Sequence, residues 1–196
     1  MSAVSIEKVN SKLLNFNRAN QKTEIDSVVI GSKKYKRFVN EFWTAKQRQA
    51  NNLHEISYRA CYKPQLPKFF IDLFTKPGDV VYDPFAGRGT TLIEAALLNR
   101  NIISNDVNPL SRILTEPRLN IPTIQQIEER LNQIQFKASN SDIDLSMFFH
   151  KDTESEIVCL RNELNSLNFV DNWIKMVCTT RLTGHSAGFF SGYTLP

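Results

Sequence analysis

The hydrophobic and polar positions in the first part of the chain predict one short strand and one helix. The β-branched run over residues 24–30 predicts a strand that ends at Gly31. Apolar residues then recur at helical spacing and predict a helix over residues 35–53; they are Phe38, Val39, Phe42 and Trp43. Residues 1–24 are mostly polar, so we expect an arm that docks only loosely.

The middle of the chain alternates between helical and extended patterns. Residues 69–74 supply the apolar face of a helix, which follows an extended entry through two prolines. Residues 79–83 predict a short buried strand, residues 90–98 a helix, and residues 101–106 a second strand. Two strands joined through a helix form a parallel unit, so we expect an α/β fold.

The last third of the chain has a helical pattern. Thr123 is a candidate N-cap for a helix that runs to residue 136, and two further helices are expected over residues 153–169 and 170–181. We therefore divide the chain into an N-terminal arm and helix, a central core and a helical region. Their bounds are 1–53, 54–119 and 120–196.

Composition narrows the class of protein only moderately. The 196 residues are 41% hydrophobic, which is consistent with a folded domain, and no apolar run is long enough to cross a bilayer. We expect a cytoplasmic protein, since no secretory signal is recognisable. The three widely spaced cysteines lack the close Cys and His pairs of a zinc site, so we expect reduced, mostly buried thiols and no metal.

The net charge of +4 gives weak support for an anionic partner. The basic excess gathers before residue 60, most densely in Lys33, Lys34, Lys36 and Arg37, with aromatic residues between. A solvated helix face and a phosphate-contacting surface explain this cluster about equally well.

The strongest chemical signal lies between the two predicted strands, in the sequence Asp-Pro-Phe-Ala-Gly-Arg-Gly-Thr-Thr over residues 83–91. Gly87 and Gly89 give a nucleotide-like cofactor close access to the backbone at the end of a strand. Asp106 ends the next strand, where a carboxylate can accept both hydroxyls of a ribose. Leu92 replaces the third glycine of the dinucleotide fingerprint, so the loop is not shaped for a pyrophosphate.

This motif resembles the S-adenosylmethionine motif of bacterial DNA methyltransferases that modify the exocyclic amino group of adenine (N-6) or cytosine (N-4). Asn-Asp-Val-Asn-Pro-Leu over residues 105–110 is similar to the ribose-binding turn of that family, and residues 54–64 resemble the segment that closes over the methionine end. Residues 181–196 resemble a stretch seen in some members. The resemblance implies S-adenosyl-L-methionine as cofactor, double-stranded DNA with a flipped-out base as substrate, and a part in restriction–modification.

The same resemblance implies a fold and a set of binding residues. The fold is the Rossmann-like class I S-adenosylmethionine-dependent methyltransferase fold, expected here to be incomplete, with helical N-terminal and C-terminal additions. Residues 54–119 form its S-adenosylmethionine-binding core. The resemblance implies that cofactor contacts come from Tyr58, Pro64, Asp83, Pro84, Phe85, Ala86, Gly87, Gly89, Thr90, Asp106, Val107 and Pro109. For Thr90, an N-cap without further function is an equally good interpretation.

The catalytic loop of this family, an Asp, Asn or Ser followed by Pro-Pro and an aromatic residue, is absent, since no two prolines are adjacent. We therefore expect a truncated or split methyltransferase, in which a second polypeptide supplies the loop. Two alternatives stay open: an RNA (tRNA guanine) methyltransferase, and a non-catalytic cofactor- or DNA-binding subunit. His150 and His185 are weak candidates for a catalytic role, of which His185 has the better claim to touching substrate.

Overall fold

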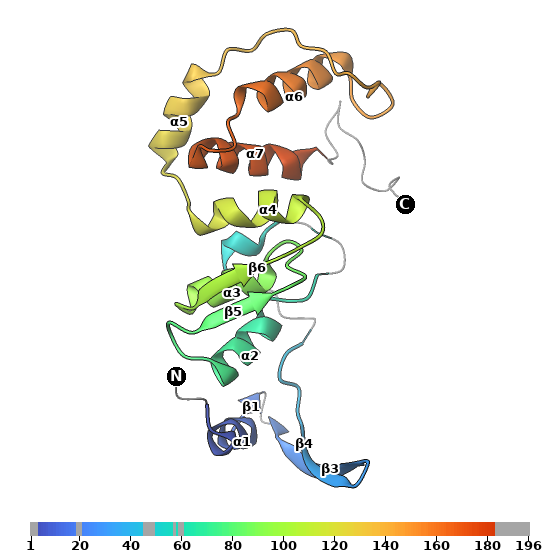
Figure 1. Cartoon of the computed structure of the whole chain (residues 1–196), viewed down its shortest axis with the longest axis vertical. Helices are drawn as coiled ribbons and strands as arrows, with labels where there is room; N and C mark the ends of the chain where they lie inside the picture. The colour runs from blue at the N-terminus through green and yellow to red at the C-terminus, as the bar shows by residue number, and fades with distance from the viewer. Residues whose placement is uncertain (1–3, 19–20, 45–49, 57, 59–60, 183–196) are drawn as a thin grey trace. The chain divides into compact units, whose positions relative to one another are not determined.

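The computed structural model describes residues 4–18, 21–44, 50–56, 58 and 61–182. The chain divides into two compact units, Met1–Val107 and Asn108–Pro196, and each is described here by itself. Among the described residues, the first unit mixes helices and strands, whereas the second contains helices alone (Figure 1). The expected mixed α/β character is therefore confirmed.

The N-terminal arm contains a helix, α1 (Ile6–Leu14), which begins at the N-cap Ser5. Lys12 of α1 forms an ion pair of 3.0 Å with Asp72 of α2 (Gln65–Phe74). A two-residue antiparallel pair follows, β1 (Asn17–Arg18) with β2 (Gln21–Lys22). This exposed ion pair links the arm to α2, and α1 has no buried residue, which is consistent with the loose docking that its polar sequence predicts.

A β-hairpin follows the arm. The strand predicted over residues 24–30 is confirmed as β3 (Glu24–Ile30), and it pairs antiparallel along its whole length with β4 (Lys33–Val39). The predicted helix over 35–53 is therefore wrong: its first residues are in β4, and Glu41–Thr44 are not helical. The two-residue loop at Gly31 and Ser32, where Gly31 has φ +63°, folds β4 back so that its backbone groups bond to β3 instead of to a helical turn.

The central part of the first unit is a strand–helix–strand unit, as the sequence predicts. β5 (Val80–Asp83) and β6 (Asn101–Ser104) pair in parallel in the register Val80↔Asn101 to Asp83↔Ser104, and α3 (Thr90–Leu97) connects them. Leu92, Ile93 and Ala95 of α3 are buried and form the core beside the sheet and α2.

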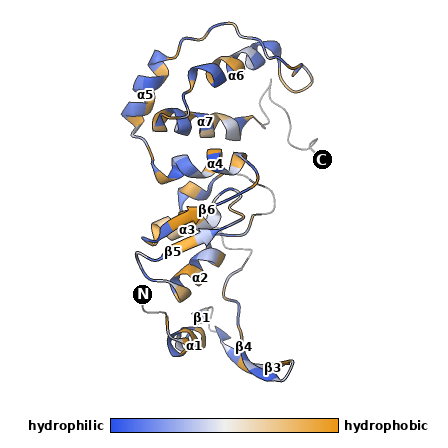
Figure 2. Ribbon diagram, viewed as in Figure 1, coloured by the Kyte–Doolittle hydropathy of each residue, from blue (hydrophilic) through white to orange (hydrophobic). Residues whose placement is uncertain are grey.

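The two faces of this parallel sheet differ. Paired residues in a sheet share a face, so Val80, Tyr82 and Ile103 lie together, and each is more than half exposed. Figure 2 colours β5 and β6 as largely hydrophobic. The prediction of a buried strand is therefore wrong for β5, in which Asp83 alone is buried, because among the described residues α3 covers one face only.

The second unit packs helices around α7 (Phe169–Arg181). Its other elements are α4 (Leu110–Thr115), the 3₁₀ helix η2 (Glu116–Leu119), α5 (Ile124–Gln133) and α6 (Lys151–Glu163). The predicted Thr123 cap is confirmed as a capping box with Gln126. Two final helices are also confirmed, although the first ends six residues earlier than expected. None of the helices in the described ranges has the length and apolar character to cross a membrane.

The three cysteines are free thiols in different surroundings. Cys159 is buried, Cys178 is half-buried, and Cys61 is exposed, so the expectation of mostly buried thiols is wrong for Cys61. Burial raises the pKa of the Cys178 thiol.

Candidate functional site

The acidic turns that follow β5 and β6 lie side by side. The Asn105 N–H donates to the Asp83 carbonyl at 3.0 Å, and the Ala86 N–H donates to the Asn105 carbonyl at 3.1 Å. These bonds extend the pairing of the two strands into their loops. Asp83 is buried, and its Oδ1 accepts the Phe85 N–H at 3.0 Å, which fixes the start of the glycine loop.

Asp106 holds the glycine loop directly. Its Oδ2 accepts the Gly87 N–H at 2.7 Å, so the carboxylate at the end of the second strand binds the loop after the first. Gly87 and Gly89 both have positive φ, +51° and +80°, which other residues rarely adopt. A Cβ on Gly87 would meet the Tyr58 ring at 3.6 Å, so Tyr58 lies at the edge of the loop.

Exposed side chains flank these acidic groups. Phe85 is 85% exposed and Val107 is 100% exposed, whereas Ala86 between the turns is buried. Pro84 is also exposed. An aromatic ring and a β-branched side chain that point into solvent at adjacent strand ends are suited to contact the faces of a planar ring.

Arg88 ties the glycine loop to the segment that precedes α2. Its guanidinium donates to the carbonyl oxygens of His54 at 3.1 Å and Ile56 at 2.5 Å. Its Nε donates to the Thr90 Oγ1 at 3.1 Å. Gly89, not Thr90, is the N-cap of α3, so the capping interpretation of Thr90 is wrong; Thr90 is buried and accepts from Arg88 instead.

A buried ion-pair geometry supports the same segment. His54, in the 3₁₀ helix η1 (Asn52–His54), places its Nε2 2.8 Å from Oε1 of Glu94 on α3, and both side chains are buried. This contact was not predicted from the sequence. The sequence feature that points to this contact is Glu94, a carboxylate within an otherwise apolar helix pattern. Such a carboxylate needs a polar partner once α3 is buried.

Tyr62 provides a further link to α3 that the sequence analysis missed. Its hydroxyl hydrogen-bonds to Thr91 Oγ1. Burial has the largest effect and raises the pKa of the Tyr62 phenol. The hydrogen bond with Thr91 lowers this pKa, and the nearby Asp83 carboxylate raises it further. The raised pKa keeps the Tyr62 phenol neutral over a wider range of pH.

The structure does not bring every predicted residue to the strand ends. Pro64 is buried at the start of α2, where it lines a cavity of about 390 Å³ with Glu94, Leu97 and Leu98. Pro109 is the N-cap of α4 and belongs to the second unit. His150 is exposed beside Asp152, and His185 lies outside the described residues.

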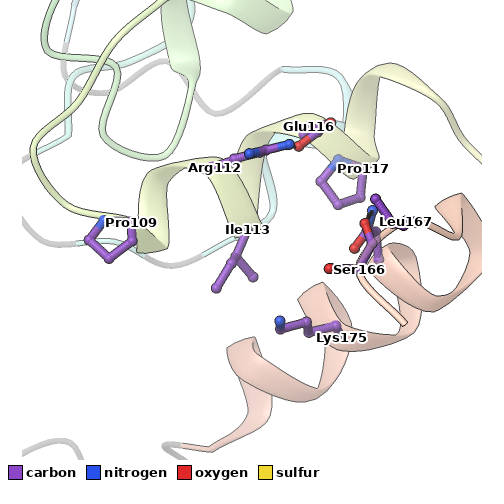
Figure 3. A pocket seen from close by; sticks show the side chains of 9 residues that line it. Pro109, Arg112, Ile113, Glu116, Pro117, Ser166, Leu167 and Lys175 are labelled. Atoms are coloured by element: carbon purple, nitrogen blue, oxygen red, sulfur yellow. Dashed lines mark hydrogen bonds and ion pairs between the residues drawn. The ribbon is translucent and has the colours of Figure 1, made fainter. Parts of the chain in front are cut away.

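The second unit has a cavity of about 340 Å³ between α4, η2, α7 and the loop before α7 (Figure 3). Its lining mixes charged and apolar groups: Pro109, Arg112, Ile113, Glu116, Pro117, Ser166, Leu167, Asn172 and Lys175. Arg112 pairs with Glu116 at 2.7 Å. The cavity shares only Pro109 with the predicted cofactor residues.

Comparisons with known proteins support the resemblance. The model of the family described as DNA methylase (N6_N4_Mtase) matches residues 6–112, more than half of the chain. The type II methyltransferase M.MjaII of Methanocaldococcus jannaschii is 30% identical over 44% of this chain and 17% of its own length. M.HindIII of Haemophilus influenzae is 50% identical over 26% of this chain and 17% of its own length.

A relative with a different printed substrate also matches. The tRNA (guanine(10)-N2)-dimethyltransferase of M. jannaschii is 28% identical over 44% of this chain and 29% of its own length. The aligned stretches thus span less than a third of these relatives. No solved structure matches the chain.

Proposed function

We propose that the ends of β5 and β6 bind S-adenosylmethionine. This chain belongs to the N6/N4 DNA methylase family, whose members use this cofactor as methyl donor. The observation that carries the proposal is the bond from the Gly87 N–H to Asp106 Oδ2. It holds the Asp106 carboxylate beside the glycine loop, at the strand end where a carboxylate binds the hydroxyls of a ribose.

The surrounding residues suit the other parts of the cofactor. Phe85 and Val107 are exposed on either turn and would contact the adenine ring. Asp83 and Tyr58 would lie at the amino acid end, with Asp83 attracting its ammonium group. Arg88 would affect cofactor binding indirectly, because its hydrogen bonds keep residues 54–56 against the loop.

We extend this proposal to the fold. The β5–α3–β6 unit corresponds to the cofactor-binding start of a Rossmann-like class I methyltransferase sheet, in which ligands bind at the carboxyl ends of the strands. Among the described residues the parallel sheet has only the strands β5 and β6, whereas such sheets commonly contain ~5 strands.

The proposed substrate is the exocyclic amino group of adenine or cytosine in duplex DNA, with the base flipped out to reach the cofactor. Transfer needs acceptors that position this amino group, the role of the Pro-Pro-aromatic loop in the family. Since the 196 residues contain no adjacent prolines, we propose that this loop comes from other polypeptide, either more of the same protein or a second chain.

Isothermal titration calorimetry with S-adenosylmethionine tests the cofactor site. We expect binding by the wild-type chain and at least a tenfold loss of affinity, about 1.4 kcal/mol, for Asp106→Ala. Asp142→Ala, at an exposed position in the second unit, is the matched control and should bind like the wild type. A folded wild-type chain that does not bind, or Asp106→Ala with unchanged affinity, would contradict the proposal.

The tRNA-modifying relative favours a second candidate, an RNA methyltransferase. A non-catalytic cofactor- or DNA-binding subunit is the third, favoured by the missing loop. Transfer of a labelled methyl group to duplex DNA or to tRNA, with and without a polypeptide that carries the loop, separates the three candidates. Methylation of tRNA alone selects the RNA enzyme, and methylation by the loop-bearing polypeptide that does not need the cofactor site of this chain selects the non-catalytic subunit.

A further inference from the structure

The β3–β4 hairpin is an exposed antiparallel ribbon that the cofactor site does not use. Figure 1 shows the two strands as a hairpin. Every residue of β3 is exposed, and so is every residue of β4 except Phe38. A two-stranded ribbon without a packed face is only marginally stable by itself. Its stability must therefore come from its base or from a partner.

The base of the ribbon is firmly attached within the first unit. The Asn40 side-chain amide donates to the Phe16 carbonyl at 3.2 Å and to Thr23 Oγ1 at 3.0 Å. Two residues further on, Phe42 packs against Phe16 and Phe69, with ring centroids 5.0 and 5.1 Å apart. An ordered base lets the rest of the ribbon extend into solvent.

Charge is distributed unevenly along the ribbon. Near the base, Asp26 and Arg37 form a two-bonded ion pair, so their charges offset each other. From Ser27 to Lys36 the sequence contains three lysines and no acidic residue. The outer half of the ribbon is therefore cationic.

The three lysines lie on both faces of the ribbon. Lys34 and Lys36 are paired with Val29 and Ser27, and share one face with them. Lys33 is paired with Ile30 on the other face, next to the Val28–Tyr35 pair. Because the major groove of B-DNA admits a two-stranded ribbon and has a phosphate backbone on each side, lysines on both faces match its charge.

From this charge pattern we infer that the outer half of the β3–β4 hairpin binds duplex DNA in a groove, with Lys33, Lys34 and Lys36 contacting phosphates. The choice of DNA as partner rests on the proposed function, but the site is distinct from the strand ends that bind the cofactor.

Fluorescence anisotropy with a labelled duplex, measured over a series of salt concentrations, tests this inference on the full chain. The variant combines Lys33→Gln, Lys34→Gln and Lys36→Gln. We expect its DNA affinity to fall on the order of tenfold at low salt, and the slope of log K against log salt to decrease by about 2.7 for three lost phosphate contacts. Replacing the same lysines by arginine should retain binding.

A matched control removes three charges elsewhere, by Lys8→Gln, Lys137→Gln and Lys151→Gln, and should retain most of the affinity. Equal loss in both triple variants would overturn the inference, as would a wild-type chain that does not bind duplex DNA or that prefers RNA. Unchanged DNA binding with increased self-association would instead assign the lysines to protecting an exposed edge strand. Calorimetry with S-adenosylmethionine on the same variants should show wild-type affinity, which separates failure of this inference from failure of the cofactor site.

Discussion

Arg88 lies between the two glycines of the loop, yet its hydrogen bonds run away from them, to the carbonyl oxygens of His54 and Ile56. Together with the His54–Glu94 pair, it fixes residues 52–56 on α3. A motif comparison assigns importance to the glycines and aspartates and leaves Arg88 without a function. The structure gives Arg88 a positioning function.

Tyr62 gives the site a dependence on alkaline pH. Burial raises the pKa of its phenol above the ordinary value of about 10, so the unfolded chain releases this proton first as the pH rises. The stabilising contribution is therefore full below about pH 10 and is lost as the pH rises through the pKa of the folded state. We expect Tyr62→Phe to show a smaller fall in Tm than the wild type in thermal melts between about pH 8 and 11.

Tyr82→Phe, on the exposed face of β5, serves as the control for this measurement. It removes a phenol at another position and leaves the Tyr62–Thr91 hydrogen bond in place. If both variants lose stability with pH as the wild type does, Tyr62 does not cause the alkaline transition.

The elements differ in how well the sequence predicts them. The unit of β5, α3 and β6 was predicted correctly because glycines, a β-branched run and a strong helix former occur in the order that a parallel unit requires. The short helix α4 was missed because six residues contain too few turns to show a period. β4 was mistaken for a helix because the spacing of Phe38, Val39 and Phe42 fits both structures, and only the turn at Gly31 distinguishes them.

The candidate site residues also differ in how well the sequence predicts their positions. The strand ends, the glycine loop and Asp106 follow from local sequence, so their placement was predictable. The contacts of Glu94, Arg88 and Tyr62 join residues about 30 to 40 positions apart, and no local pattern specifies such partners.

In the second unit, the ion pair between Arg130 and the buried Asp171 connects three elements. Arg130 of α5 donates to Asp171 of α7 at 2.6 Å and to the Glu163 carbonyl at the end of α6 at 2.9 Å. The Asp171 side chain is 2% exposed and also accepts the Asn165 N–H at 2.8 Å. Removing its charge leaves the partly buried guanidinium without a counter-ion.

We expect Asp171→Asn to lower the free energy of unfolding by about 1–3 kcal/mol, less than for a fully buried pair because Arg130 is partly exposed. Urea denaturation followed by circular dichroism measures this loss. Asp142→Asn, on the exposed loop before α6, makes the same chemical change and should shift the midpoint very little. Equal midpoints for the two variants would show that the ion pair does not hold the helices together.

For the molecule as a whole, the unequal faces of the parallel sheet predict an unequal response to mutation. Leu92 of α3 is 0% exposed, so Leu92→Ala removes packed methyl groups and should cost about 2–5 kcal/mol. Ile103 on the other face is 55% exposed, and Ile103→Ala should stay within about 0.5 kcal/mol of the wild type. Thermal and urea unfolding of the isolated chain compare them; a large loss for Ile103→Ala would mean that the face is covered in solution.

The bond between Gly87 and Asp106 means that one carboxylate both shapes the loop and is proposed to receive the ligand. A change at Asp106 therefore alters the backbone of residues 86–89 in the unliganded chain as well as the affinity. Conversely, a ribose that hydrogen-bonds to Asp106 weakens the bond between this carboxylate and the Gly87 N–H. Exchange of that amide hydrogen with solvent should therefore become faster when the ligand binds, even if the ligand does not contact the amide.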